Sequence, residues 1–261
     1  MSTLDVAVVQ EPAVAGDVAG NSRRAVAILA EHPGVDIVVL PELFLCGYRL
    51  DTVGTAAMEV SSAAVAELCA AAAAHGTVLL TGFAERAGDA VYNSLLCIDP
   101  TGAVAGVYRK THLFGAEADA FAAGDRIEVI EVAGLRLGPM ICFDVEFPEV
   151  ARTLALSGVD LFVVASANME PYHRDHRVAC LSRALENRTS LVYSNLVGAE
   201  AGLTFVGGSR VVSGDGDVIV ECGGAVATAQ SRLTLGAGVG AEVDEDVDYL
   251  RHRRPELYRL S

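Results

Sequence analysis

DIVVLPE, residues 36–42, is an almost unbroken run of apolar side chains that ends in a carboxylate. DLFVVASAN, residues 160–168, has the same character in the second half of the chain. Strands that lack alternating polar residues are typical of sheets covered on both faces. We therefore predict sheets that lie buried between other layers of the fold.

Further β-branched runs alternate with helix-length segments along the chain. Strands are predicted near residues 5–10, 36–41, 77–83, 90–98, 105–109, 127–132, 135–142, 160–166, 190–197, 207–213 and 217–221. Helices are predicted near residues 18–32, 58–75, 148–157 and 172–188. Asn21 and Ser22 are candidate caps of the first helix, and Gly76 follows the second. This alternation predicts an α/β protein.

The two halves of the chain echo one another. The first half contains, in order, the segments DVAVVQ, DIVVLPE, TVLLTGF and AVYNSLLCI. The second half contains the corresponding segments LRLGPMICF, DLFVVASAN, SLVYSNLVG and GGSRVVSGDG in the same order. Each half reads strand, helix, strand, helix, strand, strand. Two such half-sheets can bury their spare apolar faces against each other with helices outside, which predicts a four-layer α-β-β-α sandwich. No linker divides the halves, so residues 1–261 are predicted to form a single domain.

Composition narrows the possible partners. A net charge of −15 repels phosphate backbones and anionic lipid, so we expect neither nucleic acid nor a membrane surface as a partner. The most apolar helical candidate, residues 60–76, is interrupted by polar side chains and reads as a buried helix. A small-molecule substrate fits this composition better.

Cysteine usage and the start of the chain bear on the compartment. Six cysteines are scattered at positions 46, 69, 97, 142, 180 and 222 with no CxxC pair, which favours reduced thiols in a cytoplasm. The first apolar run contains Asp5 and follows no basic region, so no secretion signal is recognised. We expect a cytoplasmic protein.

Three residues at predicted strand ends have the chemistry of a thiol hydrolase. Glu42 suits proton transfer because partial burial would raise the pKa of its carboxyl group. Cys142 is a potential nucleophile, and Lys110 nearby would lower the pKa of its thiol and hold oxyanion charge. Taken singly, each residue also has a purely structural interpretation. Glu42 could cap a helix, Cys142 could be a buried structural cysteine and Lys110 could lie on the surface.

The sequence segments around these three residues favour the catalytic interpretation over the structural one. PELFLCGY (41–48), YRKTHLF (108–114) and GPMICFDVEFPE (138–149) resemble, in order and spacing, the signature blocks of the nitrilase superfamily of carbon–nitrogen hydrolases. The resemblance runs from DVAVVQ to RRPELY near the C-terminus. It implies the α-β-β-α sandwich, a homodimer or higher oligomer, and neither a metal nor an organic cofactor.

The resemblance also implies residue roles. Glu42 corresponds to the general base, Cys142 to the nucleophile and Lys110 to the electrostatic stabiliser, which shares the oxyanion with the backbone N–H of Phe143. Glu117, ahead of the Ala-Gly-Asp turn at 123–125, matches the second active-site glutamate, and Asp119 is its rival.

Substrate preference rests on weaker signals. The CFDVEFPE block looks closer to the amidase-like branches, which implies hydrolysis of a small aliphatic or uncharged amide. Nitrile or N-carbamoyl hydrolysis on the same residues, and a non-catalytic binding member of the fold, are the alternatives. Candidate pocket walls, for which core packing is an equal reading of the aromatic and Met side chains, are Tyr48, Phe114, Phe121, Phe143, Glu146, Asn168, Met169 and Phe205.

Other polar features have plainer explanations. His173 and His176 lie three apart on a predicted helix, but no third ligand of matching spacing supports a metal site, and we expect this helix to face solvent or another subunit. Arg183 and its neighbours are expected to be buried polar scaffold around the site. The C-terminal tail, residues 242–261, carries Tyr249, Leu250, Leu257 and Tyr258, which suit either solvent or packing on another subunit.

Overall fold

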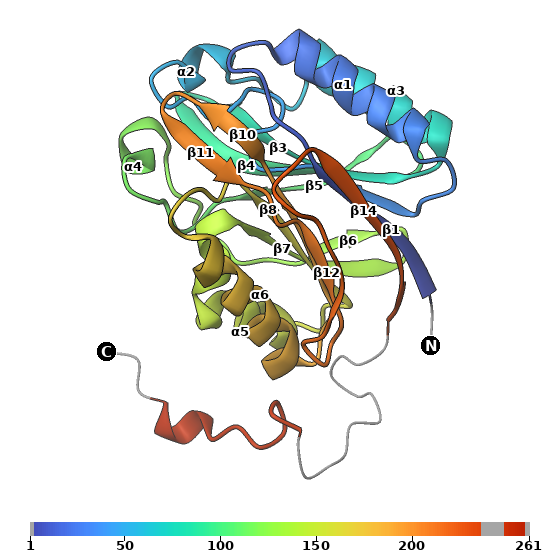
Figure 1. Cartoon of the computed structure of the whole chain (residues 1–261), viewed down its shortest axis with the longest axis vertical. Coiled ribbons are helices and arrows are strands. Elements are labelled where there is room, and N and C mark those ends of the chain that lie inside the picture. The colour runs from blue at the N-terminus through green and yellow to red at the C-terminus, as the bar shows by residue number, and fades with distance from the viewer. Residues whose placement is uncertain (1–2, 236–247, 259–261) are drawn as a thin grey trace.

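Strand β2, Ile37–Val39, explains the layering of the molecule. Successive side chains of a strand point to opposite faces of its sheet. Val38 packs against helices on one face, whereas Ile37 and Val39 pack against a second sheet on the other. The computed structural model, which describes residues 3–235 and 248–258, repeats this arrangement in a second sheet (Figure 1).

The first sheet has the strand order β14-β1-β2-β3-β4-β5. Its central strands β1, β2 and β3 are parallel, and β14, β4 and β5 are joined to them by antiparallel pairing. Besides β2, its strands are β1 (Thr3–Gln10), β3 (Val78–Ala87), β4 (Ala90–Ile98), β5 (Val104–Arg109) and β14 (Ala227–Thr234). Helices α1 (Val18–Glu31) and α3 (Ala63–His75) cover its outer face, and α2 (Val53–Ala56) and α4 (Glu117–Ala120) are short loop helices.

The second sheet has the order β13-β12-β9-β8-β7-β6 and the same plan. Parallel β7, β8 and β9 form its centre, with antiparallel partners on both sides. Its strands are β6 (Ile130–Val132), β7 (Leu135–Ile141), β8 (Leu161–Ser166), β9 (Leu191–Asn195), β12 (Arg210–Val212) and β13 (Val218–Glu221). Helices α5 (Pro148–Leu156) and α6 (His173–Asn187) cover it, and η1 (Cys142–Glu146) leads from β7 into α5.

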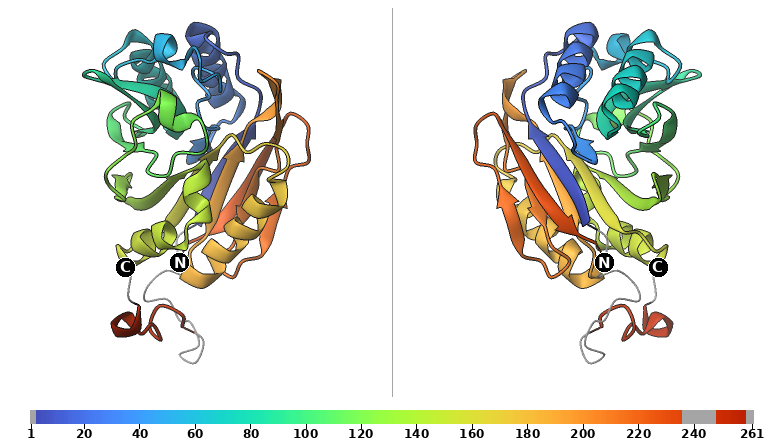
Figure 2. Two further views of the ribbon diagram at one scale, coloured as in Figure 1. Left: turned by 90° about the vertical axis from the view of Figure 1, so that its left-hand side faces the viewer. Right: turned by 90° about the vertical axis from the view of Figure 1, so that its right-hand side faces the viewer.

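The predicted α-β-β-α sandwich is confirmed, and Figure 2 shows the four layers from the side. The central core lies between the sheets, where Val8 and Val39 of the first sheet join the same apolar cluster as Val163 and Val192 of the second. Burial of this shared face is the main force that joins the two half-sheets.

The internal echo corresponds to real equivalence in topology. β1, β2 and β3 occupy the same places in their sheet as β7, β8 and β9 in theirs, and each set is followed by two antiparallel strands. The edge strand that completes the first sheet was missed. β14 comes from the far end of the chain, and of its eight side chains only Ala229 and Leu233 are buried.

Some predicted boundaries are wrong. Asp17 caps α1 by accepting from the Gly20 amide, and Asn21 and Ser22 lie inside the helix. The second helix was expected from residue 58 but begins at Ala63, because Met58 bridges to β3 and Ser62 caps the helix. A ribbon of β10 (Val197–Glu200) and β11 (Leu203–Val206) occupies the link between β9 and β12.

The described part of the tail, residues 248–258, runs below α5 and α6 in Figure 1 and includes the short helix η3 (Pro255–Leu257). The Arg188 guanidinium lies 5.1 Å from the centre of the Tyr249 ring, while Leu257 and Tyr258 are exposed. Residues 242–247 and 259–261 of the predicted tail lie outside the described residues, and its packing on another subunit stays a prediction. Within the described residues, no helix combines the length and apolarity that a membrane span requires.

Candidate active site

The carboxyl ends of four strands bring the candidate residues to one edge of the sandwich. Glu42 follows β2, Lys110 follows β5 and Cys142 follows β7, while Ser166 ends β8. β5 points the same way as β3 because two antiparallel pairings separate them. In open α/β sheets this edge is where ligands commonly bind.

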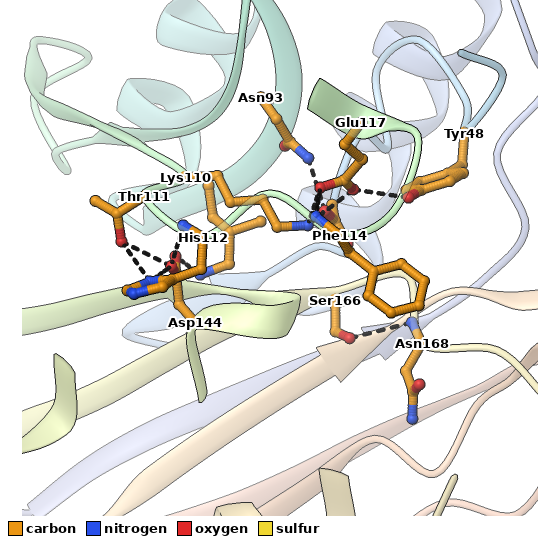
Figure 3. Close-up of polar contacts among 12 residues, drawn as sticks. Tyr48, Asn93, Lys110, Thr111, His112, Phe114, Glu117, Asp144, Ser166 and Asn168 are labelled. Carbon is orange, nitrogen blue, oxygen red and sulfur yellow. Dashed lines mark hydrogen bonds and ion pairs between the residues drawn. The ribbon is translucent and has the colours of Figure 1, made fainter. Parts of the chain in front are cut away.

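Lys110 lies at the centre of a buried ion cluster. Its Nζ is 2.8 Å from Glu42 Oε1 and 2.8 Å from Glu117, and all three side chains are excluded from solvent (Figure 3). Burial lowers the pKa of this ammonium, but the neighbouring acidic groups of Glu42, Cys142 and Glu117 together raise it above its ordinary value. Lys110, the only lysine in the chain, is therefore cationic. The alternative interpretation of Lys110 as a surface lysine is therefore wrong.

Glu42 has one engaged and one unengaged carboxylate oxygen. Oε1 accepts from Asn93 Nδ2 at 2.7 Å as well as from Lys110, whereas Oε2 is buried and accepts no hydrogen bond from the described part of the chain. Burial raises the pKa of this carboxyl group, with Lys110 opposing the shift, and so confirms the direction expected from the sequence. A carboxylate in this state is suited to exchanging a proton.

Cys142 directly follows β7 and is the first residue of η1, where its backbone is strained. Its φ of 47° lies in the left-handed region that side chains with a Cβ rarely adopt, and 9% of its surface is accessible. Burial is the largest influence on its thiol and raises the pKa, with Glu42 and Glu117 adding to the shift against Lys110 and Ser166. Lys110 lowers this pKa, as expected from the sequence, but burial and the two carboxylates outweigh its effect, so the net shift is upward and not toward neutrality. The resting sulfur is a neutral thiol.

Glu117 rather than Asp119 points into the cluster. Its Oε1 accepts from Tyr48 Oη at 2.7 Å, its Oε2 accepts from the Phe114 amide at 2.8 Å, and it is fully buried. Asp119 is exposed to solvent on the same short helix. These contacts hold Glu117 against Lys110 and fix the loop that follows β5.

Asp144 joins the Lys110 loop to the Cys142 turn, a role that sequence reasoning missed. Its Oδ1 accepts from Thr111 Oγ1 at 2.8 Å and from the His112 amide at 3.0 Å, and it lies 2.9 Å from His112 Nδ1. Its Oδ2 accepts from the Ile141 amide and from Tyr108 Oη, both at 3.0 Å. The carboxylate is completely buried, so the two loops share one rigid hydrogen-bond centre (Figure 3).

A narrow pocket opens beside the Cys142 sulfur. Its cavity volume is about 20 Å³, and its walls are Tyr48, Phe114, Cys142, Phe143, Glu146, Ala167, Asn168, Met169, Tyr172 and His176. The structure therefore brings together every predicted wall residue except Phe121 and Phe205. Both of these are buried in the apolar core that the first sheet forms with α1 and α3, where Phe205 also packs edge-on against Tyr48.

Polar residues shape the floor and support of this pocket. Glu146 Oε1 lies 3.1 Å from Nε2 of His176, which is buried although its helix was expected to face solvent or another subunit. Arg183 donates to the carbonyls of Val145 and Glu146 at 3.0 and 2.9 Å, as expected of polar scaffold. No group of three or more His, Cys, Asp or Glu side chains suited to a metal occurs among the residues that the structure describes.

Asn93, Asp144, Ser166 and His176 were missed or misread because nothing local marks them. Each acts through a partner distant in the sequence, such as Glu42, 51 positions from Asn93. The available signals were weak: an aspartate two residues after Cys142, and polar residues at the ends of otherwise apolar strands.

Comparison with known proteins identifies the same chemistry. The family model described as carbon-nitrogen hydrolase matches residues 5–235. The chain is 39% identical to a hydrolase in the pqqF 5′ region of Pseudomonas protegens, over 99% of this chain and 92% of that protein. It is 36% identical to an (R)-stereoselective amidase of Pseudomonas sp., over 92% of this chain and 87% of that one.

A solved structure of an amidase from Nesterenkonia sp. AN1 superposes with a TM-score of 0.85 at 30% identity. The match covers 97% of this chain and 95% of that chain. In that structure, of a mutant, the acetamide moiety of fluoroacetamide has added covalently at the active-site cysteine.

Proposed function

Because the chain belongs to the carbon–nitrogen hydrolase family, and is therefore a hydrolase of carbon–nitrogen bonds, we propose that it converts small uncharged carboxamides to carboxylic acid and ammonia. The reaction proceeds through a thioester on Cys142. Glu42 is the general base, and Lys110 and the Phe143 backbone N–H hold the oxyanion.

The first half of the reaction acylates the enzyme. Glu42 takes the proton of the Cys142 thiol while the sulfur attacks the amide carbon. The carbonyl oxygen becomes an oxyanion that Lys110 and the Phe143 N–H stabilise. The carbon–nitrogen bond then breaks, and ammonia leaves with the proton that Glu42 held.

The second half returns the free enzyme. Glu42 removes a proton from water, the resulting hydroxide attacks the thioester carbon, and the carbon–sulfur bond breaks to release the acid. The Glu42 proton returns to the sulfur. Glu117 holds Lys110 in place.

One observation carries the proposal. The Glu42 carboxylate is anchored through Oε1 by Lys110 and Asn93 and keeps Oε2 unengaged, beside a thiol that burial keeps protonated. A neutral thiol needs a base to become a nucleophile, and a carboxyl group with a raised pKa can give the proton back to the leaving amine.

The preference for small, uncharged acyl groups is supported by the pocket. Its cavity volume of about 20 Å³ is little more than one water molecule needs, which favours a small acyl group. Its walls carry a carboxylate, Glu146, and include neither Arg nor Lys among the described residues that line it. Both features favour short, uncharged amides over long or anionic ones.

A substrate panel tests this function. Short amides, the matching nitriles and N-carbamoyl amines would be compared by ammonia release, with Cys142→Ala as the blank. The proposal expects amides to have the highest kcat/KM. Faster turnover of nitriles, or carbon dioxide release from carbamoyl compounds, would favour the alternatives that use the same residues.

We propose further that the enzyme is a cytoplasmic homo-oligomer. All six cysteines are free thiols, which suits a reducing compartment. Leu156, Val178 and Leu185 expose apolar side chains on α5 and α6, and Leu156 lines a surface pocket together with Pro255 and Tyr258 of the tail. Light scattering on the full chain and on a chain ending at Val243 tests the assembly, and an unchanged mass after truncation would count against a role for the tail.

A further inference from the structure

Ser166 lies beside the nucleophile for a reason built into the second sheet. The parallel register of β7 and β8 pairs Ile141 with Ala165, so Cys142 and Ser166 are the next residues at the same edge. Ser166 therefore lies next to Cys142, and its side chain opposes the rise in the pKa of the thiol. Ser166 is fully buried, so water does not compete for its hydroxyl.

The other contacts of Ser166 leave its proton for the sulfur. Its Oγ accepts from Tyr193 Oη at 3.0 Å and from the Asn168 amide at 3.2 Å (Figure 3 draws the second contact). A hydroxyl has one proton and two acceptor positions. With both acceptor positions filled, the proton of Ser166 is directed toward Cys142.

The Tyr193 hydroxyl is in turn oriented by His176, a residue of the pocket wall. Because the Tyr193 hydroxyl proton goes to Ser166, its oxygen accepts from His176 Nδ1, which lies 2.9 Å away. This fixes the proton on Nδ1 of the imidazole. The other ring nitrogen, Nε2, lies 3.1 Å from Glu146 Oε1. Each residue of this series thus donates to the next, from His176 in the pocket wall through Tyr193 to Ser166 beside the sulfur.

We propose that Ser166 is a further catalytic residue, which donates a hydrogen bond to the Cys142 sulfur and stabilises the thiolate formed when Glu42 removes its proton. Tyr193, His176 and Glu146 are the positioning residues that orient this hydroxyl. The inference deepens the proposed function and rests on it only for the choice of Cys142 as nucleophile.

The electrostatics of the site explain why such a donor is useful. The charged groups that face the sulfur are Glu42, Lys110 and Glu117, which carry two negative charges against one positive charge when both carboxyl groups are ionised. A neutral hydroxyl stabilises a developing thiolate without adding a cation that would also hold Glu42 and Glu117 more tightly. Hydrogen bonds to ionised acceptors are about twice as strong as those between neutral groups.

The test measures thiolate formation without requiring turnover. Alkylation of Cys142 in the full-length enzyme by iodoacetamide would be followed across a pH series, with the labelled peptide quantified by mass spectrometry. Ser166→Ala should raise the pKa of the alkylation profile by about one unit, which is about a tenfold lower rate at any pH below it. Tyr193→Phe should cause a smaller change in the same direction.

Two further variants separate orientation from packing. His176→Phe should slow alkylation, whereas His176→Asn should restore it because the asparagine Nδ2–H can take the place of the imidazole Nδ1–H. Ser194→Ala is the matched control, since Ser194 is an equally buried serine near the end of a central strand whose hydroxyl donates to the Val9 carbonyl at 2.6 Å. It should leave the alkylation profile unchanged.

An unchanged alkylation profile in Ser166→Ala would overturn the inference, even if that variant lost activity or stability, because it would show a structural role only. If Ser166→Ala does not fold, Tyr193→Phe and the two His176 variants decide in the same way. Failure of the proposed function looks different: Cys142→Ala would retain turnover whatever the Ser166 variants do.

Discussion

Asp144→Asn should disconnect the Lys110 loop from the Cys142 turn while barely changing the size of the side chain. In the native protein both carboxylate oxygens accept from a backbone amide, Oδ1 from His112 and Oδ2 from Ile141. An asparagine has only one acceptor oxygen, so either orientation of its amide turns an N–H toward one of these backbone donors. The hydroxyls of Tyr108 and Thr111 can reverse their direction, but a backbone amide cannot.

The size of the expected destabilisation follows from the number of backbone N–H groups that lose their acceptor. One buried N–H left without a partner costs about 1–3 kcal/mol, and the remaining bonds lose the strengthening that a charged acceptor provides. Removing the cost of burying a charge offsets part of this loss. We expect the free energy of unfolding to fall by about 2–3 kcal/mol. We also expect kcat to fall by at least about tenfold, because misplacing catalytic groups by about 1 Å costs more than that.

Urea unfolding and steady-state kinetics measure the two effects. Asp119→Asn is the matched control, because this aspartate is exposed on the neighbouring short helix and should change unfolding by less than about 0.5 kcal/mol. If Asp144→Asn unfolds within that margin and keeps its kcat, Asp144 does not connect the loops and the reasoning is refuted.

Three further predictions concern the charges of the site. Lys110→Met should abolish turnover and destabilise the fold by about 3–5 kcal/mol, since it leaves Glu42 and Glu117 buried without a cation; a chemical denaturation curve like that of the unmodified enzyme would contradict this. Glu42 acts as a base only when deprotonated and burial raises its pKa, so kcat/KM should fall with decreasing pH at a midpoint above the ordinary value of 4.5; a pH–rate profile with its acid limb at or below that value would exclude this assignment. Amides with a carboxylate on the acyl chain should have a higher KM than neutral amides of equal length, and Glu146→Gln should narrow the gap; equal KM values in the unmodified enzyme would show that Glu146 does not repel the acyl group.

The layered fold could be predicted because its causes are local. Apolar runs such as residues 36–42 and 160–168 indicate strands buried on both faces, and the repeated order of elements indicates two equivalent half-sheets. β14 could not be recognised in the same way. Its register with β1, which pairs Thr3 with Thr234, is set by the folded first sheet rather than by its own small and polar side chains.

The site was predictable to the extent that strand ends and signature blocks mark it. Glu42, Lys110 and Cys142 were located because each follows a recognisable strand. The protonation state of Cys142 was not predictable, since it depends on burial and on how many carboxylates surround the thiol. The positions of Asp144 and His176 depend likewise on contacts between separate loops and helices, which a linear pattern does not contain.

The thioester on Cys142 is the central claim, and trapping it is the most direct test. A small amide substrate would be mixed with the enzyme, quenched in acid within a turnover, and the protein digested for peptide mass analysis. We predict a mass increase equal to the acyl group on the peptide that contains Cys142, and neither adduct nor turnover in Cys142→Ala. An acyl adduct on another residue, or full turnover in Cys142→Ala, would contradict the account.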